Sequence, residues 1–192
     1  MGQRTDTRER IVHSSLQAMR EQGFTATAIS DIVTASGAPR GSVTFHFPGG
    51  KDEIAGEVIK LRTSQVLAGV EDIAAANTSA KDFLLACIDA VADDFAASGF
   101  TAGCPVAPIA IERGTRAPVL RQTSADFFRA WRDSVARHLT GYGIESTRAA
   151  RVSTLMVSAV EGALVISRTE ETLDAIHAVR DELALLPLDA DD

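Results

Sequence analysis

The sequence predicts an all-α protein with about nine helices. Apolar side chains recur three and four residues apart in one segment after another, which is the spacing of an amphipathic helix. Alanine is abundant and aromatic residues make up only 5% of the chain. The alternation of apolar and polar residues that is typical of a half-buried strand is hard to find. These three observations together favour a fold built from helices alone.

Three helices are expected within the first 50 residues. The first begins between residues 5 and 7 and ends at Gly23, because glycine tolerates the backbone conformation that stops a helix. Thr27 is a plausible N-cap for the second helix, whose inner face is expected to include Ile29. Pro39 suits the first turn of the third helix, where no amide partner is needed, and that helix ends near Phe47.

Six further helices are expected after residue 50. Glycine, proline or short polar runs separate them, and each carries an apolar stripe at helical spacing. The expected positions are residues 51–72, residues 80–97, a short segment after Cys104-Pro105, a long segment from Pro118 to the turn at residues 141–143, residues 145–167 and residues 170–186.

The segment 145–167 is apolar on two sides and must therefore be buried on two sides. Small side chains along it permit another helix to approach closely. Two interpretations are open: the central helix of a monomeric bundle, or a helix with the core on one side and a second subunit on the other. We favour the second, with either face as the interface. The expected interface residues in this segment are Val152, Leu155, Ala159, Gly162 and Ala163.

The length of 192 residues fits one large domain, or a small domain joined to a larger one. The net charge is −7, but residues 1–62 carry eight basic and seven acidic side chains, so the acidic excess falls on the remainder. A small DNA-reading head on an acidic body has this charge distribution, and so does an ordinary acidic enzyme. Charge alone does not separate these two classes of protein.

Two cysteines are too few for a disulfide framework in a chain of this length. Charged residues or glycine interrupt every apolar run, so no membrane span is expected. The N-terminus has no apolar core behind its basic residues and is not a secretory signal. We therefore expect a cytoplasmic protein with no membrane partner.

The stretch from Gly23 to Lys51 is the most informative part of the chain. Two short helical patterns meet at Ser36-Gly37, and a turn follows directly after them. This is the layout of a helix-turn-helix, which places side chains in the major groove of DNA.

The same stretch resembles the TetR family of bacterial regulators, in a collinear match over about the first 55 residues. A second run, Gly103-Cys104-Pro105-Val106 followed by Glu112, is similar to a drug- or flavonoid-responsive branch of that family. The residues that carry the first resemblance are Ile11, Val12, Gly23, Phe24, Thr27, Ala28, Ile29, Ile32, Val33, Ala35, Ser36, Gly37, Gly41, Ser42, Val43, His46, Phe47 and Lys51.

The resemblance implies an all-helical homodimer with a helix-turn-helix DNA-binding domain, residues 1–50, and an effector-binding and dimerisation domain, residues 51–192. The implied partners are double-stranded DNA with a near-palindromic operator, a second copy of the chain, and a small molecule. The implied function is a repressor that a small apolar or aromatic effector releases from its operator. The expected interface then also includes Leu173, Ile176 and Val179 in the last helix.

In this family the third helix enters the major groove and the second lies across the DNA backbone. Arg40 is the best candidate for reading bases, because a guanidinium can bond to O6 and N7 of guanine together. Thr27, His46 and Lys51 are candidates for phosphate contacts. The whole set of candidate DNA-binding residues is Arg4, Arg8, Thr27, Pro39, Arg40, Gly41, Ser42, Thr44, Phe45, His46 and Lys51.

One position departs from the family pattern. The family usually has a tyrosine where this chain has Thr44, and that tyrosine commonly touches the DNA backbone. Recognition is therefore expected to rely on the neighbouring residues. Phe45 lies in the same stretch, although its ring, like that of Phe47, is expected to pack inside the head.

An effector pocket would be built from apolar and aromatic side chains of several helices. Phe95, Phe128 and Trp131 are the sharpest candidates, and core packing is the commoner role at most other positions. Glu112 and Glu161 are expected in apolar surroundings, where a carboxylate needs a partner. The candidate effector-binding residues are Phe83, Cys87, Ile88, Val91, Phe95, Cys104, Ile109, Phe127, Phe128, Trp131, Met156 and Glu161.

Two alternative functions stay open. Cys104 stands at the expected start of a helix, where a thiolate is favoured, so a thiol-based redox-sensing regulator is one of them. A small buried side chain is the commoner role of such a cysteine. The other alternative is a helical ligand-binding or interaction protein with a degenerate head. This alternative stays open because Thr44 stands where the family usually has a tyrosine.

An enzyme is the main rival class of protein. The sequence has no Gly-rich phosphate loop after a strand, no GxSxG and no HExxH motif. Its four histidines are scattered and neither cysteine belongs to a CxxC pair. We therefore expect no enzymatic activity, no cofactor and no bound metal.

Overall fold

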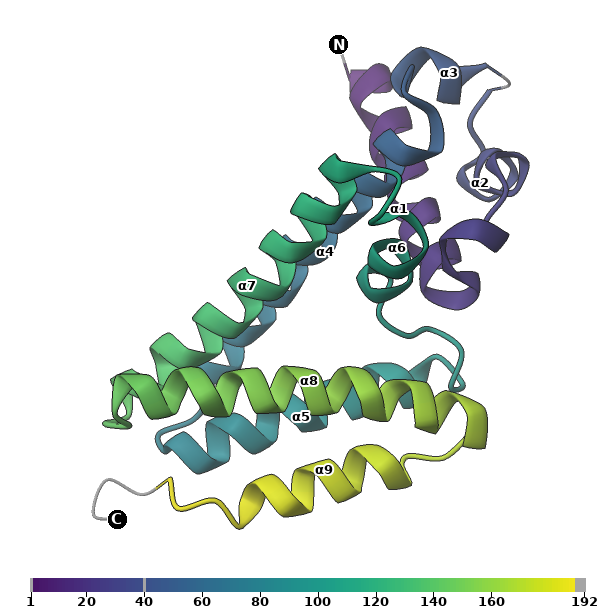
Figure 1. Ribbon diagram of the computed structural model, residues 1–192. Coiled ribbons are helices and arrows are strands. Elements are labelled where there is room, and N and C mark those ends of the chain that lie inside the picture. The colour runs from purple at the N-terminus through teal and green to yellow at the C-terminus, as the bar shows by residue number, and fades with distance from the viewer. Residues whose placement is uncertain (1, 40, 189–192) are drawn as a thin grey trace. The chain divides into compact units, whose positions relative to one another are not determined.

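A computed structural model describes residues 2–39 and 41–188, with side chains from residue 6 onward (Figure 1). This part of the chain contains nine helices and no strand, which confirms the all-α prediction. The helices are α1 (Gly2–Ala26), α2 (Ile29–Ser36), α3 (Ser42–His46), α4 (Gly50–Ala76), α5 (Ala80–Ala97), α6 (Val106–Arg113), α7 (Pro118–Gly141), α8 (Ser146–Glu170) and α9 (Asp174–Ala184).

The chain divides into two compact units. The first unit extends to residue 63 and also includes residues 104–127, so it contains α1, α2, α3, the start of α4, α6 and the start of α7. The second unit comprises residues 64–103 and the chain from residue 128 on, with the rest of α4 and α7 together with α5, α8 and α9. The division into functional domains at residue 50 stays a prediction.

In the first unit, α1 packs against α2, α3 and α6. Its inner face is fully buried at Ile11 and Met19. The helical conformation breaks at Gly23, with φ 78° and ψ 178°, a backbone conformation that glycine adopts without strain. This break confirms the predicted stop at Gly23 and lets Phe24 fold back into the core, where 6% of it is exposed.

In the second unit, α5, α8 and α9 pack together (Figure 1). By length and composition α8 could cross a membrane, contrary to the prediction that no segment would qualify. Val152, Met156, Val160 and Ala163 of this helix are buried within the unit. Its opposite side leaves Leu155 51% exposed, so α8 has one core face and one open apolar face.

Candidate nucleic-acid interface

Helix α3 is held by two inward side chains one turn apart. Val43 is 4% exposed and Phe47 is 1% exposed. Because a helix repeats every 3.6 residues, the positions between them face outward. Thr44 is exposed and Phe45 is 62% exposed, so the expectation that Phe45 packs inside the head is wrong. Phe47 does pack there, as predicted.

The turn before α3 depends on two glycines in the left-handed region, Gly37 with φ 60° and Gly41 with φ 88°. Pro39 is exposed within this turn, and its carbonyl accepts a hydrogen bond from the Ser42 amide at 3.0 Å. The third helix therefore begins at Ser42, and the prediction that Pro39 occupies its first turn is wrong. Arg40, the predicted base reader, lies outside the described residues.

Thr27 has a structural role in place of the predicted N-cap, and its phosphate contact stays a prediction. The N-cap of α2 is Ala28, and Thr27 is 0% exposed. The Thr27 hydroxyl donates to the carbonyl of Gly23 at 2.7 Å, which ties the end of α1 to the start of α2. Ile29, predicted to face inward, is 40% exposed and stands at the first position of the helix, while Ile32 is fully buried as predicted.

Lys51 points back into the head. Its ammonium donates to the carbonyl oxygens of Thr25 at 3.2 Å and Thr27 at 2.7 Å, and it lies 4.4 Å from the centroid of the Phe24 ring. Partial burial lowers the pKa of Lys51. The ammonium thus closes the α1–α2 corner, and its predicted phosphate contact stays a prediction.

Arg8 also has partners inside the first unit. Its guanidinium pairs with the Glu57 carboxylate at 2.9 Å and lies 5.1 Å from the centroid of the Phe47 ring. Hydrogen bonds from Lys60 and Arg8 lower the pKa of Glu57. Arg8 therefore links α1 to α4 within the unit. The side chain of Arg4 lies outside the described residues.

The remaining candidates meet on the outer side of α3 and its preceding turn. Gly41, Thr44 and Phe45 are exposed, and Ser42 and His46 are half-buried. The imidazole of His46 meets the ring of Phe45 edge to face, with 5.0 Å between the centroids. Five predicted residues thus form one surface on a helix-turn-helix, the geometry that enters a major groove.

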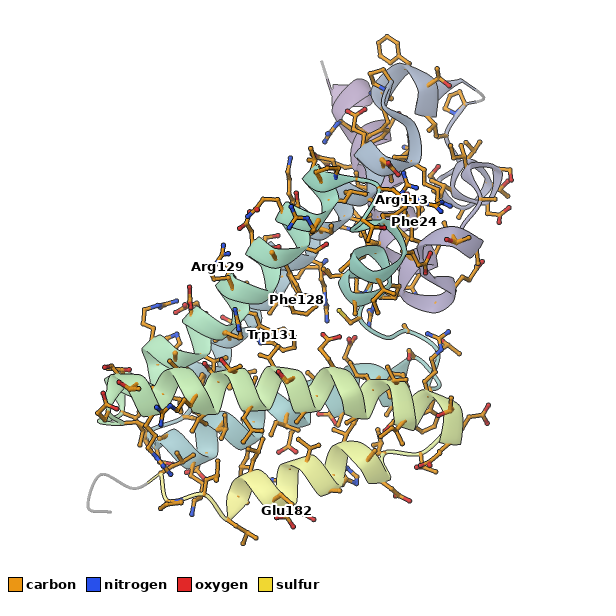
Figure 2. All side chains as sticks on the ribbon, viewed as in Figure 1. Phe24, Arg113, Phe128, Arg129, Trp131 and Glu182 are labelled. Atoms are coloured by element: carbon orange, nitrogen blue, oxygen red, sulfur yellow. The ribbon has the colours of Figure 1, made fainter. Side chains whose placement is uncertain are left out.

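Helix α6 makes contacts that the sequence did not predict. The Glu112 carboxylate accepts hydrogen bonds from the amide and the hydroxyl of Thr25, at 2.6 Å for the amide. The Arg113 guanidinium binds the Asp52 carboxylate at 3.1 and 2.5 Å, which raises the pKa of Arg113. Figure 2 shows Arg113 beside Phe24, whose ring centroid is 5.6 Å from the guanidinium carbon.

Glu112 is therefore exposed and hydrogen-bonded, and the expectation of apolar surroundings is wrong. These partners are distant in the chain, since Thr25 precedes Glu112 by 87 residues. No local signal in the sequence could have identified the pairing.

The predicted effector residues are divided between the two units. Cys104, Ile109 and Phe127 belong to the first unit, and the others to the second. Most are core residues: those with at most 5% of their surface exposed are Phe83, Cys87, Ile88, Phe95, Ile109, Phe127 and Met156. Those that are half-buried are Val91, Cys104, Phe128 and Glu161.

Within the second unit, Figure 2 shows Phe128 and Trp131 on one side of α7 and Arg129 on the other. Trp131 is 7% exposed and Phe128 is half-buried. Burial raises the pKa of the Cys87 thiol to about 12, so this cysteine is a poor nucleophile. The partly exposed Cys104 precedes α6.

The predicted dimer residues form two groups, one buried within the single chain and one at its surface. Val152, Ala163 and Ile176 are 6%, 3% and 0% exposed within the single chain, so they pack mainly inside it, and their contact with a partner stays a prediction. They face the core because their sides of α8 and α9 pack within the unit. The remaining residues reach the surface, with Leu155 and Gly162 exposed and Ala159, Leu173 and Val179 half-buried.

Comparison with known proteins agrees with this geometry. Residues 11–58 match the family of bacterial regulatory proteins of the tetR type, and residues 80–182 match the C-terminal domain of LmrA/YxaF-like transcriptional regulators. An uncharacterised helix-turn-helix transcriptional regulator of Mycobacterium tuberculosis is 34% identical over 187 residues, which cover 94% of each protein. LmrA of Bacillus subtilis is 27% identical over 164 residues, which cover 85% of this chain and 87% of LmrA.

The fold is also similar to solved structures. A TetR transcriptional regulator from Legionella pneumophila has a TM-score of 0.81 at 22% identity, over 91% of this chain and 94% of that one. A TetR regulator from Chloroflexus aurantiacus has a TM-score of 0.78 at 25% identity, over 96% and 95% of the two chains. With both halves of the sequence matched and the exposed α3 in place, the chain belongs to the TetR family of DNA-binding transcriptional regulators.

Proposed function

We propose that this regulator is a homodimeric repressor that binds a near-palindromic operator and is released from it by a small apolar or aromatic effector. The observation that carries the proposal is the outer surface of α3. It follows a glycine-rich turn and presents Thr44 and Phe45 to the solvent while Val43 and Phe47 anchor the helix. This arrangement leaves the side chains of α3 available to base edges.

A second copy of the chain is the partner that fits the open face of α8 and α9. A groove of about 460 Å³ between these helices has a mainly apolar lining, formed by Leu155, Ala159, Ala178, Val179, Glu182, Leu183 and Leu186. Val165 and Ile166 of α8 are also 67% and 48% exposed. Large apolar surfaces of this kind are typical of subunit interfaces.

A two-fold dimer requires an operator with two-fold symmetry. Its half-sites should lie about one helical turn apart, roughly 34–36 Å, or a multiple of that distance. Footprinting on the DNA upstream of the gene should protect a near-palindrome with this spacing. Absence of protection, in a preparation that is folded and dimeric, would contradict the proposal.

For the effector, the second unit offers the half-buried Val91 and Phe128 and the nearly buried Trp131. Aromatic side chains that are partly covered can bind an apolar ligand without leaving polar groups unsatisfied. Small aromatic compounds should quench Trp131 fluorescence and weaken operator binding with the same concentration dependence. A compound that binds but leaves operator affinity unchanged is not the effector.

We place the protein in the cytoplasm, where a regulator of this family meets chromosomal DNA. The apolar α8 is accounted for by its packing within the second unit and by the proposed subunit contact.

A further inference from the structure

The ring of Phe45 is exposed on the face of α3 that is available to DNA. With 62% of its surface open, it contributes little to the packing of the head. Among the described residues of α3, only Thr44 and Phe45 are exposed, and Phe45 has the longer side chain. An aromatic ring in this position is open to contact with a duplex that α3 enters.

The ring is also limited in its directions before DNA is present. Val43 and Phe47 are buried and fix the rotation of the helix about its axis. The imidazole of His46 meets the ring of Phe45 at an interplanar angle of 83°. A side chain that is already confined loses less conformational entropy on binding than a free one.

The chemistry of the major groove narrows what this ring can recognise. Base edges present donors and acceptors there, and also one apolar group, the C5-methyl of thymine. A phenyl ring has no hydrogen-bonding group, so the methyl is the base feature that it matches. Insertion of apolar wedges between base pairs occurs from the minor groove, which the third helix of a helix-turn-helix does not enter.

We propose that Phe45 contacts the methyl group of one thymine in each half-site of the operator, and thereby sets the sequence preference at that position. The inference rests on the proposed function, because it requires α3 in the major groove. It assigns to Phe45 a reading role by van der Waals contact, next to Thr44, which stands where the family has a tyrosine. Thymine is then preferred over cytosine because unmodified cytosine lacks the methyl.

The test replaces each thymine of the footprinted operator, one symmetric pair at a time, by deoxyuridine, which removes only the methyl. For the wild-type protein, replacement of one such thymine pair should raise the Kd by about fourfold for each methyl removed. Phe45→Ala should bind the thymine and deoxyuridine operators equally, and Phe45→Leu should retain part of the discrimination.

Ile111→Ala serves as the matched control, since Ile111 is 81% exposed in the same unit but lies on α6. This variant should discriminate as the wild type does. The proposal is overturned if no thymine pair is sensitive in the wild type, or if Phe45→Ala keeps the discrimination. Failure of the wild type to bind any upstream DNA specifically would instead overturn the proposed function.

Discussion

At the scale of single residues, two cations of the head have structural partners. Lys51 binds two backbone carbonyls and Arg8 pairs with Glu57, although both side chains were predicted to contact DNA. A basic residue in a DNA-binding domain can therefore stabilise the domain as well as bind phosphate. The two roles have different dependence on salt, which makes them separable by experiment.

Lys51→Met should lower the free energy of unfolding by about 1–2 kcal/mol, because two carbonyls lose a charged donor. The slope of log Kd against log salt for operator binding should stay unchanged, since the ammonium is directed at the protein. Unfolding by urea and salt-dependent binding titrations measure the two effects. Arg40→Ala is the comparison, because it should weaken the sequence preference at one base position. A salt slope that changes in Lys51→Met but not in Arg40→Ala would contradict the structural role of Lys51.

Glu145 stabilises the start of α8 in a way that depends on pH. Its carboxylate accepts hydrogen bonds from the amides of Thr147 and Arg148, which lower the pKa of Glu145 to about 2 from an ordinary 4.5. Because the folded-state pKa is the lower one, the contribution is fully present above about pH 4.5 and is lost as the pH falls towards 2.

Glu145→Gln should therefore be less stable than the wild type at pH 7, and the difference should shrink between pH 4.5 and 2. Urea unfolding at a series of pH values measures it. Glu145→Asp should restore most of the stability, because aspartate is a favoured N-cap residue. A difference that is independent of pH would show that the carboxylate charge is not involved.

At the scale of helices, apolar periodicity predicts the presence of a helix well and the residues at which it begins and ends less well. The predicted span of α5, residues 80–97, is the observed one, because Ser79 caps it and its stripe is regular. Helix α3 begins at Ser42 and not at Pro39, whose carbonyl accepts a hydrogen bond from the Ser42 amide. The exposure of Phe45 follows from helical geometry, because Val43 and Phe47, one turn apart, face inward.

The sequence did not predict the contacts between helices that are far apart in the chain. Asp52 and Arg113 are 61 residues apart, and their pairing depends on how α4 and α6 pack. The same holds for the two faces of α8, where only packing shows that Val152 faces the core and Leu155 the surface. A helix that is apolar all round gives no signal of which side is covered.

The Arg113–Asp52 pair should couple α6 to α4 energetically. Arg113→Leu and Asp52→Asn should each destabilise the protein, and the double variant should be more stable than the sum of the two effects predicts. Unfolding free energies of the four proteins in a double-mutant cycle measure this coupling. Additive effects would mean that the ion pair is only a surface contact.

At the scale of the whole molecule, the acidic excess lies outside the first 62 residues, so the DNA-reading part is nearly neutral. A single head with nearly balanced charge has weak electrostatic attraction to a duplex. Two heads joined in one dimer bind with an avidity that exceeds either affinity by roughly 10²–10⁴. Operator binding should therefore depend strongly on the α8–α9 surface.

Leu155→Glu tests this dependence, because Leu155 is 51% exposed and lines the apolar groove of α8 and α9. A carboxylate there would lose its hydration at the subunit contact, so sedimentation should show a monomer with unchanged helical content. Operator affinity should fall by at least about 100-fold, since each head then binds alone. Val119→Glu, at a position 76% exposed at the start of α7, should stay dimeric and bind as before. If the Leu155→Glu protein remains a dimer, the subunit contact does not lie in this groove.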